Sequence, residues 1–507
     1  MRLNKRLIKI LLFILGFLVV VGIMAQLFFA HKVEDVLQEE VPKNITLDYK
    51  SLSTNVLLGS ITLNGVQLNS EGVELESKRI KVSGLHFIPL LKSGDIVISE
   101  LFFDEPSFSV VVKKDSSSKS ANGQKSKSIF FEKFQIQNGQ FKVHQKVNDS
   151  SGLKIENIDL VLKEVAFNEQ TKNRVVPFSL KDYSLSTKKG YYDLSSLEFI
   201  TWRDLHIDTQ SGYINKLLLQ SKYNKGELSK MLTVEHDHYD IAFDSIALVQ
   251  PNFGLDEGSP KLHFAKVHLQ RPEIGVYRDK LLPDDTTIKK LYNQSLRDLD
   301  FDLKVDSIEV SSGQVSYQER VVADVKPERL LFTEVYADIL NIHSRGNGMV
   351  VVDINAELMG DGPLTLNWSF DPMKSDNEFL VTGSLAQFDS SKINPFLRTN
   401  MKAEVKGSIH QMYFTFSGHE FKSHGDMKMS YDDFEFFVLK KDRLGVNKLL
   451  TAVVSIFTND GKKTDKDGFR YGQYEVERNR EKSFFNYLWL NVKEGLMSTM
   501  SGNGKKE

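Results

Sequence analysis

The sequence predicts a mainly β protein with a transmembrane helix at its N-terminus. Two patterns indicate this: one long apolar run near the start, and many later segments in which apolar and polar residues alternate. The composition agrees, because Phe is abundant (34) and Pro is scarce (12). A chain of 507 residues is long enough for two or three ordinary domains or for one elongated, repetitive domain.

Residues 10–30 are apolar except for Gln26. At ~1.5 Å per residue, a helix of this length crosses a ~30 Å hydrocarbon core. Basic residues precede the run and acidic residues follow it, which predicts a cytoplasmic N-terminus and export of the rest. A cleaved signal peptide is the alternative. The run is longer than a usual signal core, and bulky Phe28 occupies the −3 position before Ala30.

From Ile45 onward the apolar period changes to two. Ile61 and Leu63, and later Ile80 and Val82, alternate with polar residues. Turn pairs such as Asn64-Gly65 separate these segments, which indicates short, half-buried strands joined by tight turns.

These patterns divide the chain into eight parts. We expect the stretch 115–128 to be a flexible loop or linker, because it has no apolar residue except Ala121. The expected parts are a cytoplasmic N-terminus (1–9), a transmembrane helix (10–30), a stalk (31–44), a first β module (45–147, loop 115–128), a middle β region (148–260), a second β module (261–345, helical insertion 282–298), a C-terminal β region (346–440), and C-terminal helices with a tail (441–507).

An internal repeat links the two β modules. Phe131–Lys146 (FEKFQIQNGQFKVHQK) matches Val305–Arg320 (VDSIEVSSGQVSYQER), and a strand–Pro–strand pattern precedes each copy. We interpret each copy as a hairpin, with Gly139 and Gly313 at the position that requires positive φ. Repetition of this kind favours an elongated array.

The C-terminal part ends in two predicted helices, at about 445–457 and 483–500. The second has a broad apolar face that includes Phe484, Leu488 and Val492. This face has three possible uses: to plug the end of a groove, to lie on a membrane surface, or to pack on the sheet as a lid.

Little in the sequence indicates catalysis, so we expect no enzyme activity and no cofactor. The net charge is −2, which gives no support for nucleic-acid binding, and the absence of Cys excludes a thiol nucleophile. His236 and His238 are a weak metal candidate, since strand residues two apart share a face. No third ligand is placed, and a solvated turn is the simpler interpretation.

The remaining feature is the apolar side of the strands. It forms either an ordinary closed core or the wall of an open apolar groove, and periodicity alone does not separate these. The groove candidates are Ile96, Ile98, Phe103, Phe108, Val110, Val112, Phe134, Ile136, Ile308 and Val310.

Three segments resemble the AsmA-like proteins of Gram-negative envelopes. They are RIKVSGLHFIPLLKSGDIVISELFFDEPSFSVVV from Arg79, FQIQNGQFKV from Phe134, and the Gly-x-Met-x-Met-x-Tyr-Asp run at 425–432. The apolar N-terminal run fits the same family, and the resemblance is weak over about 168–258.

The resemblance implies an elongated, curved antiparallel β-sheet groove with internal repeats and C-terminal helices. It also implies a single-pass protein of the inner membrane, with a cytoplasmic N-terminus and a periplasmic bulk. Such a protein handles phospholipid and supports outer-membrane biogenesis and lipid homeostasis, possible partners being envelope or outer-membrane proteins. The alternative is a non-lipid envelope scaffold or an assembly factor for outer-membrane proteins.

Overall fold

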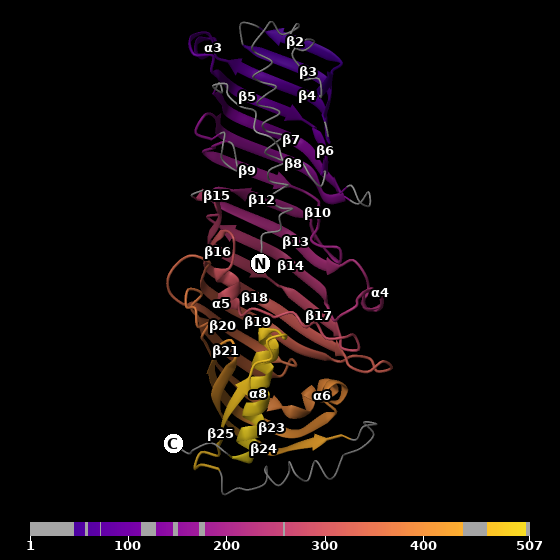
Figure 1. Ribbon diagram of the computed structural model, residues 1–507, viewed down its shortest axis with the longest axis vertical. Coiled ribbons are helices and arrows are strands. Elements are labelled where there is room, and N and C mark those ends of the chain that lie inside the picture. The colour runs from indigo at the N-terminus through magenta and orange to yellow at the C-terminus, as the bar shows by residue number, and fades with distance from the viewer. Residues whose placement is uncertain are drawn as a thin grey trace. The chain divides into compact units, whose positions relative to one another are not determined.

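The computed structural model describes residues 45–55, 59–70, 72–112, 128–145, 151–171, 178–256, 259–439 and 464–502. Strands make up 63% of the structure and helices 12%, so the predicted mainly β class is confirmed (Figure 1). The strands form curved, mixed β-sheet. The prediction of a purely antiparallel sheet is therefore wrong.

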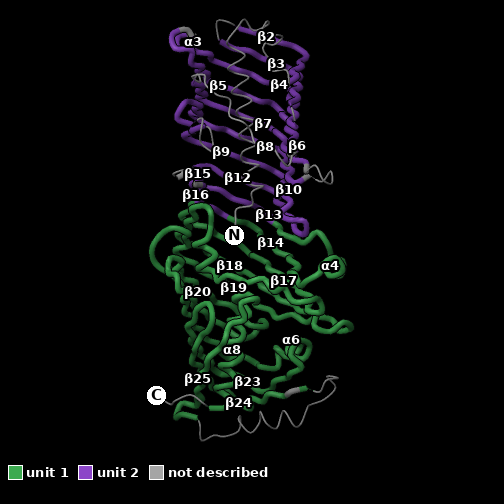
Figure 2. Tube along the Cα trace, viewed as in Figure 1, with its two compact units in different colours: residues 1, 218–246, 263–507 green, residues 2–217, 247–262 purple. Residues whose placement is uncertain are grey.

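The described residues fall into two compact units (Figure 2). Unit 2 contains the residues up to 217 together with 247–262, and unit 1 contains 218–246 and everything from 263 onward. Three strands have residues in both units: β13 (Ser211–Ser221), β14 (Asp237–Val249) and β16 (Ser259–Gln270).

Unit 2 is built from strands and one described helix, α3 (Phe87–Lys92). Its strands are β1 (Ile45–Asp48), β2 (Ser51–Asn55), β3 (Ser60–Ser70), β4 (Val73–Leu85), β5 (Ile96–Asp104), β6 (Ser107–Val112), β7 (Ile129–Gln145), β8 (Ser151–Phe167), β9 (Asp182–Thr187), β10 (Gly190–Asp193), β11 (Glu198–Trp202), β12 (Asp204–Asp208) and β15 (Asn252–Asp256).

The parallel pairing in unit 2 occurs at the first β module. β3, β4 and β5 pair antiparallel in chain order, and β7 pairs antiparallel with β8. β5 and β6, however, both run parallel to β7. Parallel neighbours need a crossover of about a dozen residues or more. The polar stretch predicted as a loop lies in the connection between Val112 and Ile129 and supplies that length; residues 113–127 lie outside the described part of the chain.

Unit 1 contains the remaining strands and most of the described helices. Its strands are β17 (Glu273–Asp279), β18 (Asp302–Arg320), β19 (Arg329–His343), β20 (Val350–Leu358), β21 (Gly362–Phe370), β22 (Phe379–Asp389), β23 (Ala403–Gly418), β24 (Lys422–Val438) and β25 (Arg470–Glu477). Its helices are α4 (Lys225–Met231), α5 (Tyr292–Arg297), the 3-10 helix η1 (Ser390–Ile393), α6 (Asn394–Asn400) and α8 (Phe484–Ser501).

The second β module repeats the parallel arrangement in unit 1. β17 pairs antiparallel with β14 and parallel with β18. The crossover between β17 and β18 contains the predicted helical insertion, of which only α5 is helical. From β18 to β25 each strand pairs antiparallel with the next, which confirms the predicted C-terminal meander.

The two copies of the repeat form equivalent backbone hydrogen bonds. Glu105 N–H donates to the carbonyl of Gln137 at 2.9 Å, and Arg271 N–H donates to the carbonyl of Ser311 at 2.8 Å. One residue further along, the carbonyls of Pro106 and Pro272 accept from Gln140 N–H (2.7 Å) and Gln314 N–H (2.8 Å) respectively. The internal repeat is thus a structural repeat as well.

The repeat is a bulged strand and not a hairpin, so that interpretation is wrong. Gly139 and Gly313 lie within β7 and β18, and positive φ belongs to the residue before each glycine. A Cβ at Gly139 would lie 2.8 Å from Cγ2 of Ile136, and one at Gly313 would lie 3.0 Å from the Pro272 ring. A side chain at either position would therefore crowd its neighbours.

Bulges recur at matching positions in both modules. The ladder of β7 with β8 shifts register around Gly139, and that of β18 with β19 shifts around Gly313. An extra residue at a bulge lets apolar side chains on either side of it share a face. Non-glycine residues with positive φ are Glu105 and Asn138 in the first module and Arg271, Ser312, Glu334 and Asn341 in the second.

In the part of the chain that the structure describes, no helix is long and apolar enough to cross a membrane. The longest of these helices, α8, carries Lys493 and Glu494. This finding overturns the predicted localisation as a single-pass inner-membrane protein with a cytoplasmic N-terminus and a periplasmic bulk. Residues 10–30, on which that prediction depended, lie outside the described residues, as does the predicted helix at 445–457.

Candidate functional site

The groove candidates of the first module lie in the core of unit 2. The exposed fractions of Ile96, Ile98, Phe103, Phe108, Val110, Phe134 and Ile136 lie between 0% and 7%. The rings of Phe103 and Phe134 pack with centroids 5.6 Å apart. Val112 ends β6, and its side chain is not among those described. The described side chains at these positions are buried in one apolar cluster.

The two candidates of the second module are only half-buried. Ile308 and Val310 of β18 occupy the positions that Phe134 and Ile136 occupy in β7, before the same bulge. The same strand geometry therefore carries buried apolar side chains in unit 2 and partly exposed ones in unit 1.

The residues of strand β20 define the face of the sheet on which Ile308 and Val310 lie. Val350, Val352, Ile354 and Leu358 are spaced by even numbers along β20, so their side chains lie on one side of the sheet. Residues directly opposite in a ladder share a face. We call this side, and the residues opposite it on neighbouring strands, the apolar face of unit 1.

One row of this face crosses seven strands. Each residue lies directly opposite the next on the neighbouring strand, and only the last lacks a side chain. The row is Ile308 (β18), Ile339 (β19), Val352 (β20), Trp368 (β21), Val381 (β22), Phe416 (β23) and Gly425 (β24). Val381 and Phe416 are buried, whereas Ile308 and Ile339 are half-buried. The row is thus closed at one end and partly open at the other.

A second row extends the partly open part toward β14. Ile241 of β14 lies opposite Ile274 of β17, Ile274 opposite Val315 of β18, and Val315 opposite Phe332 of β19. Phe332 lies opposite Leu358, which places the row on the apolar face. All five side chains are half-buried.

Helix α8 covers the closed part. It packs on β24 and β25, and its Phe484 ring stacks on Trp368 with centroids 4.5 Å apart. Its own residues Tyr487 and Met500 are buried. Of the three uses considered for this helix, the structure shows the lid on the sheet.

A charged cluster holds the segment that precedes α8. Lys482 Nζ donates to Glu235 (2.8 Å) and to Asp284 (2.7 Å), and Lys280 Nζ donates to Glu235 (2.5 Å). Only 3% of the Glu235 side chain is exposed. Burial raises the pKa of Glu235, but the hydrogen bonds from Lys280 and Lys482 outweigh it, and the pKa lies below its ordinary value. The cluster therefore fixes the start of α8 by paired charges.

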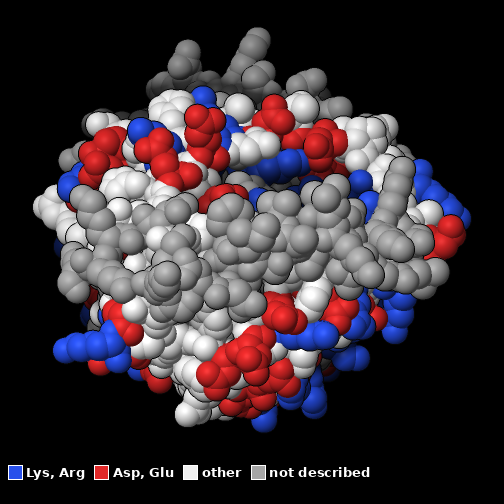
Figure 3. Space-filling model, turned by 90° about the horizontal axis from the view of Figure 1, so that it is seen from below, with Lys and Arg blue, Asp and Glu red and all other residues white. Residues whose placement is uncertain are grey.

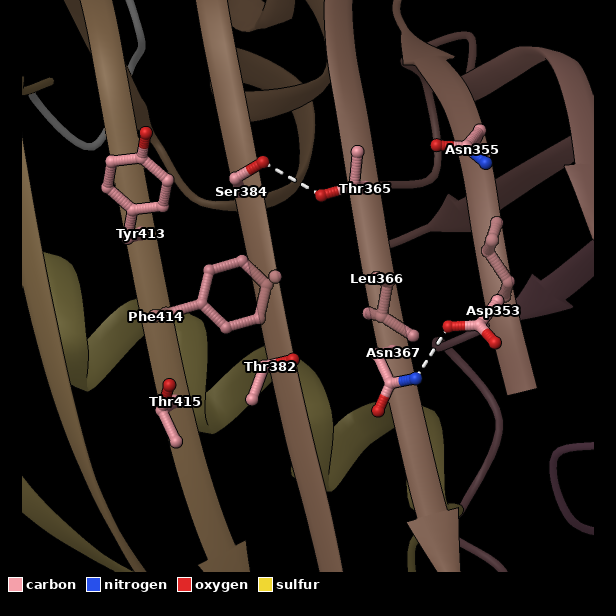
Figure 4. Close-up of a pocket in the computed structure, with 12 residues that line it drawn as sticks. Asp353, Asn355, Thr365, Leu366, Asn367, Thr382, Ser384, Tyr413, Phe414 and Thr415 are labelled. Atoms are coloured by element: carbon pink, nitrogen blue, oxygen red, sulfur yellow. Dashed lines mark hydrogen bonds between the residues drawn. The ribbon is translucent and has the colours of Figure 1, made fainter. Parts of the chain in front are cut away.

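Strands β20 to β23 have a polar face on the side opposite the apolar face. A shallow cavity of about 390 Å³ lies there over β20 to β23 (Figure 4). Asn367 donates to Asp353 at 2.5 Å, and Thr365 and Ser384 are hydrogen-bonded at 2.8 Å. The cavity has one carboxylate, and no imidazole or cation lines it, so it lacks an acid–base pair of the kind that catalysis uses.

Acidic and basic side chains are interspersed over the surface seen in Figure 3. Together with the net charge of −2, this mixture gives little field of one sign at long range.

The two histidines do not form a metal site with a third ligand. His238 Nε2 lies 3.0 Å from the carbonyl of Tyr223, and the His236 ring packs edge-on against Tyr239. Among the described residues, no group of three or more His, Cys, Asp or Glu is placed to hold a metal ion.

Sequence reasoning missed most residues of the apolar face, including Ile339 and Phe332 of β19. The bulge at Glu334 interrupts the alternation of LLFTEVYADILNIH, so no clean period of two marks this strand. The repeat itself was the available signal, because β19 follows the second copy as β8 follows the first.

The sequence matches no protein-family model and no curated protein. The resemblance to AsmA-like proteins therefore stays a prediction.

Proposed function

We propose that the partly open part of the apolar face of unit 1 binds the acyl chains of phospholipid. The carrying observation is the continuity of this face: half-buried Ile308 and Ile339 lie in the same row as buried Val381 and Phe416. The row offers a ligand an apolar surface across several strands without a charged group.

Acyl chains suit such a surface energetically. Each buried methylene contributes ~0.8 kcal/mol, so a chain that buries ten methylenes gains ~8 kcal/mol before ordering costs. No specific chemistry is needed, which agrees with the expectation of a non-catalytic protein. The resemblance supports the same proposal, and support of outer-membrane lipid homeostasis is the cellular role that it implies.

Photocrosslinking from two adjacent residues tests the proposal. Ile339 lies on the apolar face, and Asp338 lies on the opposite face and is exposed. Each position is replaced by a photoreactive phenylalanine analogue in the full chain, which is then incubated with labelled phospholipid vesicles. We expect labelled lipid on the Ile339 variant at least tenfold above the Asp338 variant; equal labelling would contradict the proposal.

A charged substitution gives an independent measurement. Ile308→Asp places a carboxylate on the half-buried row and should abolish lipid binding while the circular dichroism spectrum is kept. Glu309→Ala, on the other face, is the matched control and should bind lipid as the natural chain does. A folded Ile308→Asp variant that still binds lipid would count against the proposed site.

A further inference from the structure

A second cavity lies on the polar face of unit 1, over β14, β17 and β18. Its volume is about 170 Å³. It is lined by residues of α4, β14, β17, β18 and the start of β19: Lys225, His238, Asp240, Ala242, Glu273, Ile274, Gly275, Val276, Tyr277, Gln314, Ser316, Gln318 and Arg329.

Cross-strand register places the polar side chains of this cavity in rows. His238, Tyr277 and Gln318 form one row, and Asp240, Gly275 and Ser316 form the next. Gly275 has no side chain, which leaves the middle of the second row hollow. A Cβ there would lie 3.1 Å from the carbonyl of Asp240.

Two cations flank the first row. Lys225 Nζ donates to Gln318 Oε1 at 2.7 Å and lies 4.8 Å from the centroid of the Tyr277 ring. Arg329 lies opposite Gln318 in the ladder of β18 and β19. Within the described part of the chain, neither cation has a carboxylate within salt-bridge distance. Burial and the charge of Arg329 lower the pKa of Lys225. Lys225 and Arg329 thus make this end of the cavity positively charged, and neither forms an ion pair with a described carboxylate.

An acidic group lies in the neighbouring row. The Asp240 carboxylate accepts a hydrogen bond from Gln220 Nε2 at 3.0 Å. Rows two residues apart along a strand are separated by about 7 Å. Glu273 lies in the row after that, opposite Ala242, and also lines the cavity. The cavity therefore has a cationic end and an acidic end.

We propose that this cavity binds a small zwitterion that carries a phosphate group and a primary ammonium group, of which phosphoethanolamine is the simplest probe. The phosphate lies between Lys225 and Arg329, where charge-assisted hydrogen bonds are strongest, and the ammonium group donates to Asp240. Because the cavity is on the polar face, this site does not depend on acyl-chain binding.

His238 provides a local reporter. Its Nε2 lies against the carbonyl of Tyr223, which assigns the proton to Nε2 in the neutral ring, and its Nδ1 is buried without a hydrogen-bond partner. Burial lowers the pKa of His238, and the charge of Lys225 lowers it further. A phosphate bound beside Lys225 offsets that charge, so ligand binding should raise the pKa of His238 in an NMR titration.

The experiment titrates the full chain with phosphoethanolamine, inorganic phosphate and ethanolamine by calorimetry. We expect phosphoethanolamine to bind at least tenfold more tightly than either single-charge probe. Lys225→Gln and Arg329→Gln should each weaken phosphoethanolamine and phosphate at least tenfold. Asp240→Asn should weaken phosphoethanolamine and leave phosphate unchanged. Lys326→Gln removes a charge from the nearby β18–β19 connection without lining the cavity, and should change nothing.

Each result is decisive. The site is overturned if phosphoethanolamine leaves His238 unshifted, or if the Lys225 and Arg329 variants bind it as the Lys326 variant does. Equal affinity for phosphate and phosphoethanolamine overturns the role of Asp240. Flotation with phosphatidylethanolamine vesicles, against phosphatidylcholine vesicles, identifies the source of the group. Flotation lost in Asp240→Asn indicates a lipid headgroup, and binding of the free probe without flotation indicates a soluble compound.

Discussion

Single residues with positive φ set the geometry of both modules. For a side chain other than Gly, the left-handed region costs roughly 1–2 kcal/mol, and Asn tolerates it better than most residues. The first module places Asn138 at the bulge, whereas the second has Ser312 at the matching position. The bulge of the second module therefore carries more backbone strain.

Replacing Ser312 with Gly should relieve this strain. We expect Ser312→Gly to raise the free energy of unfolding by about 0.5–1 kcal/mol, because Gly adopts positive φ without a steric cost. Urea denaturation measures the change. Ser307→Gly, in the extended part of β18, is the control and should lower stability by about the same amount. If both substitutions destabilise the protein, the bulge is not strained.

Glu235 should make stability depend on pH. Its pKa is lower in the folded chain than its ordinary value of 4.5, so the carboxylate adds stability above that pH. The contribution is lost as the pH falls through the folded pKa. We expect Glu235→Gln to cost about 3 kcal/mol at pH 7, because it leaves Lys280 and Lys482 without their buried partner.

The pH profile separates this effect from a general loss of packing. The difference in unfolding free energy between the natural chain and Glu235→Gln should stay constant from pH 7 to about 5 and shrink below about 4.5. Asp284→Asn changes a mostly exposed partner of the same cluster and should cost less than 1 kcal/mol. A difference that does not vary with pH would rule out this role of the carboxylate.

Among the elements, α8 is the one whose position the sequence predicts best and whose packing it predicts least. The expected range, 483–500, is within one residue of the observed helix at each end. Ser483 accepts from Asn486 N–H as an N-cap, and Gly502 ends the helix with positive φ. These are local signals. The covering of β24 and β25 depends on contacts distant in sequence, such as Phe484 with Trp368, which periodicity does not encode.

Two adjacent phenylalanines test the lid. Phe484 is 4% exposed and packs against Trp368 and Phe379, whereas Phe485 is 64% exposed. Phe484→Ala should lower the free energy of unfolding by about 3–4 kcal/mol and shift tryptophan emission to longer wavelength. Phe485→Ala should stay within about 0.5 kcal/mol. Similar losses from both substitutions would contradict the packing of α8.

The strand elements show where sequence reasoning stops. Alternation identifies β3, β4, β20 and β21, because these strands keep a period of two over most of their length. It does not give direction: the strand–Pro–strand pattern does not reveal that the strands on both sides of Pro106 run parallel to β7, or that the strand after Pro272 runs parallel to β18. Direction follows from the crossover that comes next, which is a property of the connection and not of the strand.

At the scale of the molecule, each unit has its own apolar cluster. Ile98 belongs to the cluster of unit 2 and Met429 to that of unit 1, and neither side chain is exposed. The sequence predicted two modules, but gave no means to see that one has a closed apolar face and the other a partly open one. That difference depends on side-chain cover, which alternation does not reveal.

Denaturation should therefore show two transitions. Ile98→Ala should lower one of them by about 3 kcal/mol and leave the other unchanged, and Met429→Ala should do the reverse. Trp202 lies in unit 2, whereas Trp368 and Trp489 lie in unit 1, so a Trp202→Phe background reports unit 1 alone. A single transition that moves equally in both variants would show that the two clusters unfold together.

The duplicated module also has a consequence for the speed and fidelity of folding. β7 pairs correctly with β5 and β6 only after a long crossover has closed, and β18 waits in the same way for β17. Pairings of this kind are slow, because loop-closure entropy is lost before the contacts form. Before β7 and β18 have paired, β17 offers either strand the same pattern of backbone hydrogen-bonding groups. The chain thus contains its own competitor for strand pairing, and side-chain differences, such as Phe134 in β7 against Ile308 in β18, distinguish the correct partner.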